Sequence, residues 1–215
     1  MAKTAIILGA SGATGSEVLK LLLEDSRYDK IKLFSRSSIN NAHPKIEEYI
    51  INLFELEKHS ESFITDEVYC CIGTTKAKTP DTDTYYKIDY GIPVTAAKLA
   101  KENNIPVFAV ISAIGADSNS SIFYNRTKGE MQEAVLEYKI PKTYILQPSL
   151  ILAERKDKRF VEKLAAALMN VFNPLLPAKY RSIKAGTIAK VMIWLCNNGY
   201  EKTIIRSDEI AKLAK

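Results

Sequence analysis

The sequence predicts an α/β fold: a doubly wound parallel sheet flanked by helices, with a small C-terminal extension on the substrate side. Two observations predict this class. Short β-branched runs alternate with longer runs of helical periodicity along the chain, which is the order of elements in βαβ units with right-handed crossovers. A glycine-rich turn also follows the first apolar run directly, at a place where open parallel sheets bind ligands.

The predicted strands are short, and the first of them is apolar on both faces, as a parallel strand covered by helices on both sides is. Strands are expected at 4–8, 31–34, 49–53, 67–72, 107–111, 143–146 and 203–205, and helices at 16–23, 89–101, 122–138, 160–172 and 185–196. The roughly 65 residues after position 150 are too few for an independent second domain. We therefore expect a single domain over 1–215, in which about 150–215 forms the substrate side.

Composition excludes several classes of protein. The net charge of +5 comes without a basic tract interleaved with aromatics, so nucleic acid is not expected as a partner. The chain has no run of about 18 apolar residues, so no transmembrane segment is expected. Three cysteines and the absence of a signal peptide predict a cytoplasmic location. Neither His43 nor His59 belongs to a recognisable metal-ligand motif, so no metal site is predicted.

The glycine turn between the first strand and the first helix predicts a pyrophosphate site. One glycine permits the tight turn, the second lets backbone N–H groups approach the phosphates, and the third lets the helix pack against the strand. The N-terminus of the helix then stabilises the negative charge. The cofactor-binding residues expected from this turn are Gly9, Gly12 and Gly15.

The end of the second strand selects the cofactor. NAD binders carry an acidic residue there for the ribose 2′-hydroxyl, whereas this chain has Arg36 and Ser37. A guanidinium can pair with a 2′-phosphate through charge-assisted hydrogen bonds, although a solvated surface arginine is the alternative. The sequence therefore predicts NADP(H) in preference to NAD(H), with Gly73 after the fourth strand allowing the backbone to pass beneath the cofactor ribose.

A tyrosine and a lysine one turn apart form the candidate catalytic pair. Tyr124 and Lys128 share a face of the helix predicted at 122–138, just after a central strand that ends at Ser112. A nearby ammonium lowers the pKa of a phenol, which would let Tyr124 exchange a proton with a carbonyl or alcohol. Ser112 would hold the substrate oxygen. Three other tyrosine–lysine pairs have this spacing but lie in loops or contain a proline.

Five segments in this order and spacing resemble one known family: GASGATGSEVLK, CCIGTT, ISAIGAD, YNRTKGE and LQPSLIL. The chain resembles the atypical short-chain dehydrogenases/reductases, and most of all their Tat-interacting-protein (oxidoreductase-like) branch. The resemblance implies a Rossmann-type fold, NADP(H) in the cleft and a Ser112–Tyr124–Lys128 catalytic set. It also implies cofactor contacts at Ser11, Ala13 and Thr14 in the glycine turn, at Ile72 beside Gly73, and at Ile151, beyond the sixth strand.

The chain departs from the family pattern in three places. Pro148-Ser149 stands where Pro-Gly is frequent, and Asn52 stands where an acidic residue is frequent after the third strand. Asp89 lies near the place of the fourth catalytic residue, which is usually an asparagine. The sequence therefore leaves undecided whether a proton relay passes through position 89.

Two function classes follow. The first is an NADPH-dependent reductase of a small carbonyl or alcohol substrate, in which Tyr124 supplies the proton. The second is an NADP(H)-binding regulatory protein with little or no catalysis, for which a protein partner and a homodimer remain open. A nucleotide-sugar epimerase ranks last, because it needs a larger substrate domain.

Two segments after the sixth strand are interpreted from composition and periodicity. The charged segment 153–159 is interpreted as a solvated loop. The segment 160–172 is interpreted as core packing, with a lid, a dimer face or a peripheral membrane contact as alternatives.

Overall fold

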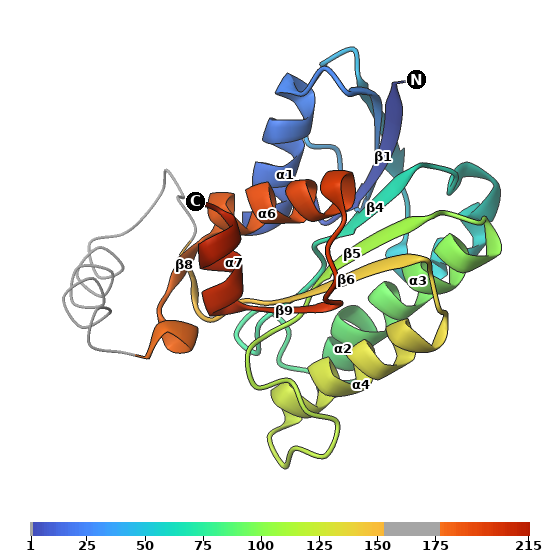
Figure 1. Cartoon of the computed structure of the whole chain (residues 1–215). Coiled ribbons are helices and arrows are strands. Elements are labelled where there is room, and N and C mark those ends of the chain that lie inside the picture. The colour runs from blue at the N-terminus through green and yellow to red at the C-terminus, as the bar shows by residue number, and fades with distance from the viewer. Residues whose placement is uncertain (1, 153–176) are drawn as a thin grey trace, which may run out of the picture.

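The computed structural model describes residues 2–152 and 177–215, which form a seven-stranded sheet flanked by helices (Figure 1). The strand order is β3-β2-β1-β4-β5-β6-β9, and every pairing is parallel. The predicted fold class is therefore confirmed. The interpretations placed on 153–159 and 160–172 lie outside the described residues.

The sheet reverses its order of growth between β1 and β4, which puts a ligand-binding crevice at their carboxyl ends. Its strands are β1 (Lys3–Leu8), β2 (Tyr28–Ser35), β3 (Ile46–Ile50), β4 (Glu67–Cys70), β5 (Val107–Ile111), β6 (Lys142–Gln147) and β9 (Ile204–Arg206). The helices are α1 (Ala13–Glu24), α2 (Thr82–Tyr86), α3 (Ile92–Glu102), α4 (Phe123–Glu137), α6 (Ala185–Asn198) and α7 (Ser207–Leu213). Shorter elements are the 3₁₀ helices η1 (Leu53–Ser62) and η4 (Ala178–Tyr180), the π-helical turn η2 (Lys87–Gly91), and a small parallel pair, β7 (Ile151–Leu152) with β8 (Ile183–Lys184).

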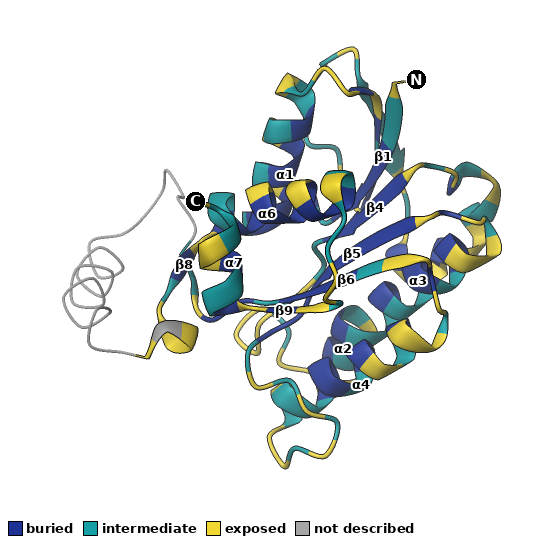
Figure 2. Cartoon of the chain, viewed as in Figure 1, coloured by how far each residue is buried: buried dark blue, intermediate teal, exposed yellow. Residues whose placement is uncertain are grey.

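Helices cover both faces of the sheet, with α1, α6 and α7 on one face and α2, α3 and α4 on the other (Figure 1). The central strands are buried between these layers (Figure 2). Strand β1 shows why: Ala5 and Ile7 belong to one buried cluster, whereas Ile6 and Leu8 belong to the other. Alternate side chains of one strand thus enter different cores, as the two-sided apolar run predicts.

Two predicted boundaries are wrong for a local reason. The strand predicted at 49–53 ends at Ile50, because the Asn52 side chain accepts a hydrogen bond from Phe54 N and begins η1. The helix predicted at 89–101 begins earlier, at Thr82, where Asp81 caps the first turn by accepting from Thr84 N at 2.7 Å. Side-chain caps of this kind stabilise a helix start that hydrophobic periodicity does not reveal.

Among the described residues, no helix has the length and apolar character needed to cross a bilayer.

Candidate active site

The glycine turn closes tightly over the carboxyl end of β1. Gly9 has a φ of +86°, and a Cβ at this position would lie 2.8 Å from the Cys71 carbonyl oxygen. A Cβ at Gly15 would lie 2.1 Å from the Gly9 carbonyl oxygen, so α1 can start against the strand only if residue 15 is a glycine. Gly12 N donates to Gly9 O at 2.9 Å and closes the turn. Both the backbone conformation and the close packing therefore require glycine.

The N-terminus of α1 provides the anion-binding end of this turn. Gly12 is the N-cap, no side chain caps the helix, and its first turn contains no acidic residue. The first N–H groups of a helix have no acceptor within the helix, and they carry the positive end of its dipole. Ala13, Thr14 and Gly15 form this first turn, so their backbone is placed where a phosphate would bind.

A cleft of about 270 Å³ opens where β1, β2 and β4 end. Six of the predicted cofactor residues line it, namely Gly9, Ser11, Gly12, Arg36, Ile72 and Gly73. The lining contains two cations, Arg36 and Lys78, and no carboxylate. In the described part of the chain, neither cation forms an ion pair. Two uncompensated positive charges beside a helix N-terminus favour an anionic ligand.

Two of the predicted cofactor residues, Ser37 and Ile151, belong neither to the cleft lining nor to the first turn of α1. The Ser37 carbonyl accepts a hydrogen bond from Ser35 Oγ at 2.9 Å, which shapes the turn after β2. Ile151 lies in β7 and packs against the buried cluster on the α1 side of the sheet. For these two residues, cofactor contact stays a prediction.

Several lining residues escaped the sequence analysis because they come from elements whose boundaries it misplaced. Leu53 and Phe54 open η1, and Ile88 lies in η2. Lys78 lies in the loop between β4 and α2, beyond the CCIGTT segment. Asn52, singled out only as a departure from the family pattern, lines the cleft as well.

Beneath Gly73, Lys128 forms a buried ion pair with Asp89. The Lys128 Nζ lies 2.8 Å from Asp89 Oδ1, and the two side chains are 4% and 1% exposed. The second carboxylate oxygen, Oδ2, accepts a hydrogen bond from Thr74 N at 2.8 Å. A Cβ on Gly73 would lie 3.6 Å from Asp89 Oδ1 and 3.9 Å from Lys128 Nζ. The pair therefore borders the floor of the cleft.

Tyr124 lies in the first turn of α4 and keeps 40% of its surface exposed. Desolvation of the phenol, followed by the negative charge of Asp89, raises the pKa of Tyr124 to about 12. The expectation that Lys128 lowers this pKa is wrong for the protein in this state. The Lys128 ammonium is paired with Asp89. The opposite charge of Asp89 offsets the effect that the ammonium would otherwise have on the pKa of the phenol.

Ser112 lies just beyond β5, and only 3% of it is exposed. Its hydroxyl oxygen accepts a hydrogen bond from Gln132 Nε2 at 2.6 Å, and Gln132 Oε1 accepts one from Gln147 Nε2 at 3.0 Å. These amides fix the Ser112 oxygen and leave its proton free to donate. The sequence analysis missed Gln132, although its position four residues after Lys128 places it on the same face of α4.

Comparison with known proteins was made at the level of sequence and of fold. No family model matches the chain. Protein FMP52, mitochondrial, of Meyerozyma guilliermondii is 32% identical over 98% of this chain and 95% of its own length. Protein HTATIP2 of Rattus norvegicus is 30% identical over 91% of this chain and 81% of its own length.

Solved structures agree on the fold. The Bordetella bronchiseptica enzyme WbmG, solved in complex with NAD, superposes with a TM-score of 0.69 at 12% identity, over 95% of this chain and 72% of its own. Sugar-nucleotide epimerases and an L-threonine 3-dehydrogenase also share the fold. The fold alone therefore does not choose between epimerisation and dehydrogenation.

The parallel sheet with its switch point and glycine turn defines a Rossmann-type fold. By sequence, the chain belongs to the family of FMP52 and HTATIP2. The resemblance noted from the five sequence segments is confirmed.

The predicted cytoplasmic location is wrong in the light of these relatives. FMP52 proteins that align with nearly the whole chain at about 30% identity are named as mitochondrial. The prediction used a sparse cysteine count, which reports on reducing conditions. Such a count does not distinguish the cytosol from another reducing compartment.

Proposed function

We propose that the protein is an NADPH-dependent oxidoreductase that reduces a small carbonyl compound. One observation carries the proposal: Lys128 lies directly beneath Gly73, which lines the cleft. Tyr124 and Gln132 lie one turn to either side of Lys128 on α4, which supports a role for Tyr124 and the Gln132-bound Ser112 beside the cofactor.

The cofactor proposal rests on the fit between the cleft and a dinucleotide. A Cβ at Gly9 or Gly15 would collide with backbone, so only glycine permits the tight turn and the close packing of helix on strand that a pyrophosphate-binding turn needs. Arg36 and Lys78 line the cleft without a carboxylate, which supports a cofactor that carries an additional phosphate. A structural neighbour solved with NAD supports the nicotinamide dinucleotide class.

The cofactor test is calorimetric titration of the protein with NADPH and NADH. We expect the protein to bind NADPH more tightly, because only NADPH has a 2′-phosphate for the Arg36 guanidinium. Equal affinity for the two would contradict the assignment to NADP(H). Absence of binding to either would contradict the proposed function as a whole.

In this scheme the bound cofactor supplies a hydride to the carbonyl carbon. The Tyr124 O–H bond breaks, and its proton passes to the carbonyl oxygen, so that C=O becomes CH–OH. The Ser112 hydroxyl donates a hydrogen bond to the same oxygen and orients it. Tyr124 then recovers a proton from water through its exposed side. Lys128 lies beneath the cleft, where it would hold ribose hydroxyls.

The catalytic test is Tyr124→Phe, which removes the proton donor and leaves the ring. We expect the rate of NADPH-dependent reduction to fall roughly a hundredfold or more, with NADPH binding retained. Tyr138→Phe is the matched control, because it removes a phenol at the opposite end of the same helix. A Tyr124→Phe variant that keeps the wild-type rate would refute the role of Tyr124.

A specific observation also favours the second candidate, an NADP(H)-responsive binding protein. Asp89 compensates the Lys128 charge that would otherwise activate Tyr124. For this candidate, we expect NADPH binding without turnover across a panel of aldehydes and ketones. A protein partner whose capture depends on NADPH would then be the positive result, whereas turnover of any panel member decides for the reductase.

A further inference from the structure

The loop between β5 and α4 connects the two hydroxyl groups that the proposed function uses. It follows Ser112 and ends at Ile122, the N-cap of α4, two residues before Tyr124. Residues 114–122 are half-buried or exposed and form turns and bends. Because surface loops are ordinarily more mobile than the elements that they join, the contacts of this loop decide how firmly the two hydroxyls are placed relative to each other.

Backbone hydrogen bonds fix the first part of the loop to the end of β6. Ser112 N donates to Leu146 O at 2.7 Å, and Ile114 N donates to Pro148 O at 3.0 Å. Ile114 belongs to the ISAIGAD segment and Pro148 to the LQPSLIL segment, so two segments of the family pattern meet here. The Ser112 end of the loop is therefore held by the sheet.

The second part of the loop is held against the start of α4. Asp117 N donates at 3.0 Å to the carbonyl oxygen of Asn125, the residue that follows Tyr124. The Arg126 guanidinium donates from Nη1 to Ser120 O at 2.9 Å. Asn125 and Arg126 belong to the YNRTKGE segment, in which only the tyrosine and the lysine have a proposed chemical role. These two contacts thus tie the loop to the helical turn that carries the phenol.

Gly129, in the same segment, permits the close approach of loop and helix. A Cβ at this position would lie 2.8 Å from Asp117 Cα and closer still to Ser118 N. Both are backbone atoms, which cannot turn aside as the end of a side chain can. Glycine within a helix is less favourable than alanine. The contact with the loop therefore explains why this buried position of α4 has a glycine.

We propose that Gly129 is a positioning residue that, together with Arg126, holds the loop against α4 and so fixes Tyr124 relative to Ser112. The proposal rests on the proposed function for its catalytic meaning, because both hydroxyls must reach one carbonyl oxygen. A displacement of about 1 Å in such an arrangement can lower a rate roughly a hundredfold. The placement of Tyr124 itself can be measured without cofactor or substrate.

The first measurement is NMR of cofactor-free protein labelled at the tyrosine rings, with the Tyr124 signal assigned by Tyr124→Phe. In Gly129→Ala the new methyl group must displace the backbone of the loop, so we expect the Tyr124 signal to shift or split. Gly91→Ala is the matched control, because in the described part of the chain no atom lies within 4 Å of a Cβ there, and it should leave the signal in place. An identical Tyr124 signal in folded Gly129→Ala and wild type would overturn the proposal.

The second measurement is the rate of NADPH-dependent reduction. We expect Gly129→Ala to lower kcat roughly tenfold or more and to retain NADPH affinity, because Gly129 does not line the cofactor cleft. A glycine needed only for stability would leave kcat per folded molecule unchanged, and that result would contradict the proposal. If the wild type reduces no carbonyl compound, the proposed function fails, whereas the NMR comparison still decides whether the loop places Tyr124.

A second pair of variants decides the matter if Gly129→Ala does not fold. Arg126→Met removes the donor to Ser120 O, whereas Arg126→Lys keeps a donor at the end of the side chain. We expect Arg126→Met to shift the Tyr124 signal and to lower kcat, and Arg126→Lys to restore both at least in part. Equal behaviour of the two variants would mean that this hydrogen bond does not hold the loop, and the proposal would be wrong.

Discussion

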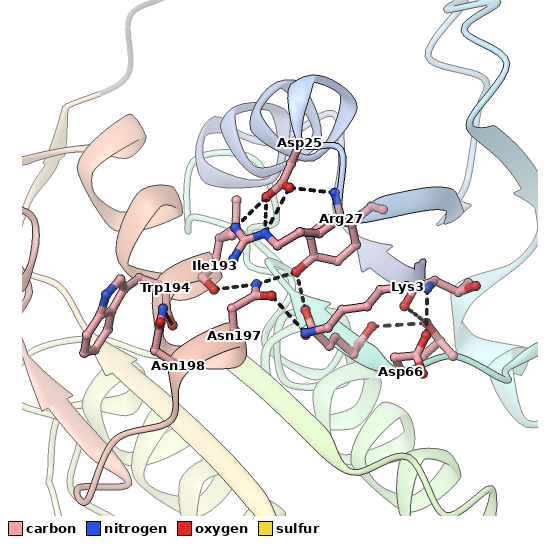
Figure 3. Close-up of polar contacts among 12 residues, drawn as sticks. Lys3, Asp25, Arg27, Asp66, Ile193, Trp194, Asn197 and Asn198 are labelled. Carbon is pink, nitrogen blue, oxygen red and sulfur yellow. Dashed lines mark hydrogen bonds and ion pairs between the residues drawn. The ribbon is translucent and has the colours of Figure 1, made fainter. Parts of the chain in front are cut away.

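A buried carboxylate pairs with a lysine at the amino ends of the sheet strands, and another does so at their carboxyl ends. The two pairs have different surroundings. At the amino end, Glu67 Oε1 lies 2.5 Å from Lys3 Nζ, and Glu67 Oε2 accepts hydrogen bonds from the Tyr28 and Tyr69 hydroxyls at 2.6 Å. Asn197 completes this network: its side-chain oxygen accepts from Lys3 at 2.8 Å (Figure 3). Its side-chain nitrogen donates to the Tyr28 hydroxyl at 2.6 Å. The network joins β1, β2, β4 and α6.

At the carboxyl end, as far as the chain is described, the pair of Asp89 and Lys128 has one further partner, Thr74 N, and borders a cleft lined by two cations that form no ion pair. The amino-end network satisfies its polar groups within the chain, as a structural element must. The carboxyl end leaves a helix N-terminus and two cations uncompensated, which costs stability unless a ligand binds there. The difference separates the structural end of the sheet from the functional one.

Glu67→Ala is expected to produce the largest effect. It removes the carboxylate shared by the Lys3 ammonium and two phenols, which we expect to lower the free energy of unfolding by about 3 kcal/mol, since Lys3 keeps Asn197 and some access to water. Urea denaturation measures this loss, and NADPH affinity should not change. Glu67→Gln, which keeps an acceptor of similar shape, should lose less. A loss of cofactor affinity without a loss of stability would reverse the assignment of the two ends.

Arg36→Leu tests the functional end. A hydrogen bond to a charged group is worth about 2 kcal/mol, so NADPH affinity should fall roughly thirtyfold, with NADH affinity unchanged. Arg27→Leu is the matched control, because Arg27 lies at the amino end and is paired with Asp25 at 2.6 Å (Figure 3). Equal losses for both cofactors would mean that Arg36 does not distinguish the 2′-phosphate.

Gly15→Ala should have a smaller effect on stability than Glu67→Ala, but it should lower both the stability and the NADPH affinity. Its methyl group meets the Gly9 carbonyl, so α1 must shift away from β1 at a cost of about 1–3 kcal/mol. The shift moves the first N–H groups of the helix, and calorimetry should show weaker NADPH binding. Gly186→Ala in α6 is the control, because its Cβ would meet only the end of the Glu17 side chain at 3.4 Å. Unchanged NADPH affinity would mean that the N-terminus of α1 does not bind the cofactor phosphates.

At the functional end, the sequence predicts those residues that belong to a local motif and misses those whose partners are distant along the chain. The glycine turn and Arg36 stand within one βα unit, where spacing and strand order fix their place. The partner of Lys128 was not predictable in this way: Asp89 is 39 residues distant in sequence and is aimed inward by a π-helical turn that periodicity does not reveal. The contacts of Gln132 with Ser112 and Gln147 likewise depend on the packing of α4 against the ends of β5 and β6.

The amino-end network shows the same limit more strongly. Lys3, Glu67 and Asn197 come from distant parts of the chain and carry no common motif. Polar residues near strand ends are ordinarily solvated, so sequence patterns alone give no reason to bury Glu67. Its burial follows from the parallel register, which places Ala5 of β1 beside Glu67 of β4.

The smallest expected effect concerns alkaline pH. Burial, followed by the hydrogen bond to Glu67, raises the pKa of Tyr28 above that of a free phenol, near 10. The folded protein thus holds this proton at a pH where the unfolded chain has released it. The stabilisation is fully present below about pH 10 and is lost as the pH rises through the folded pKa. Tyr28→Phe should therefore flatten the decline in unfolding free energy above that pH. Tyr124→Phe should flatten it less, because solvent reaches Tyr124, which is 40% exposed, whereas Tyr28 is 1% exposed. Equal slopes in the two variants would mean that the phenols at the two ends of the sheet are equally shielded from water.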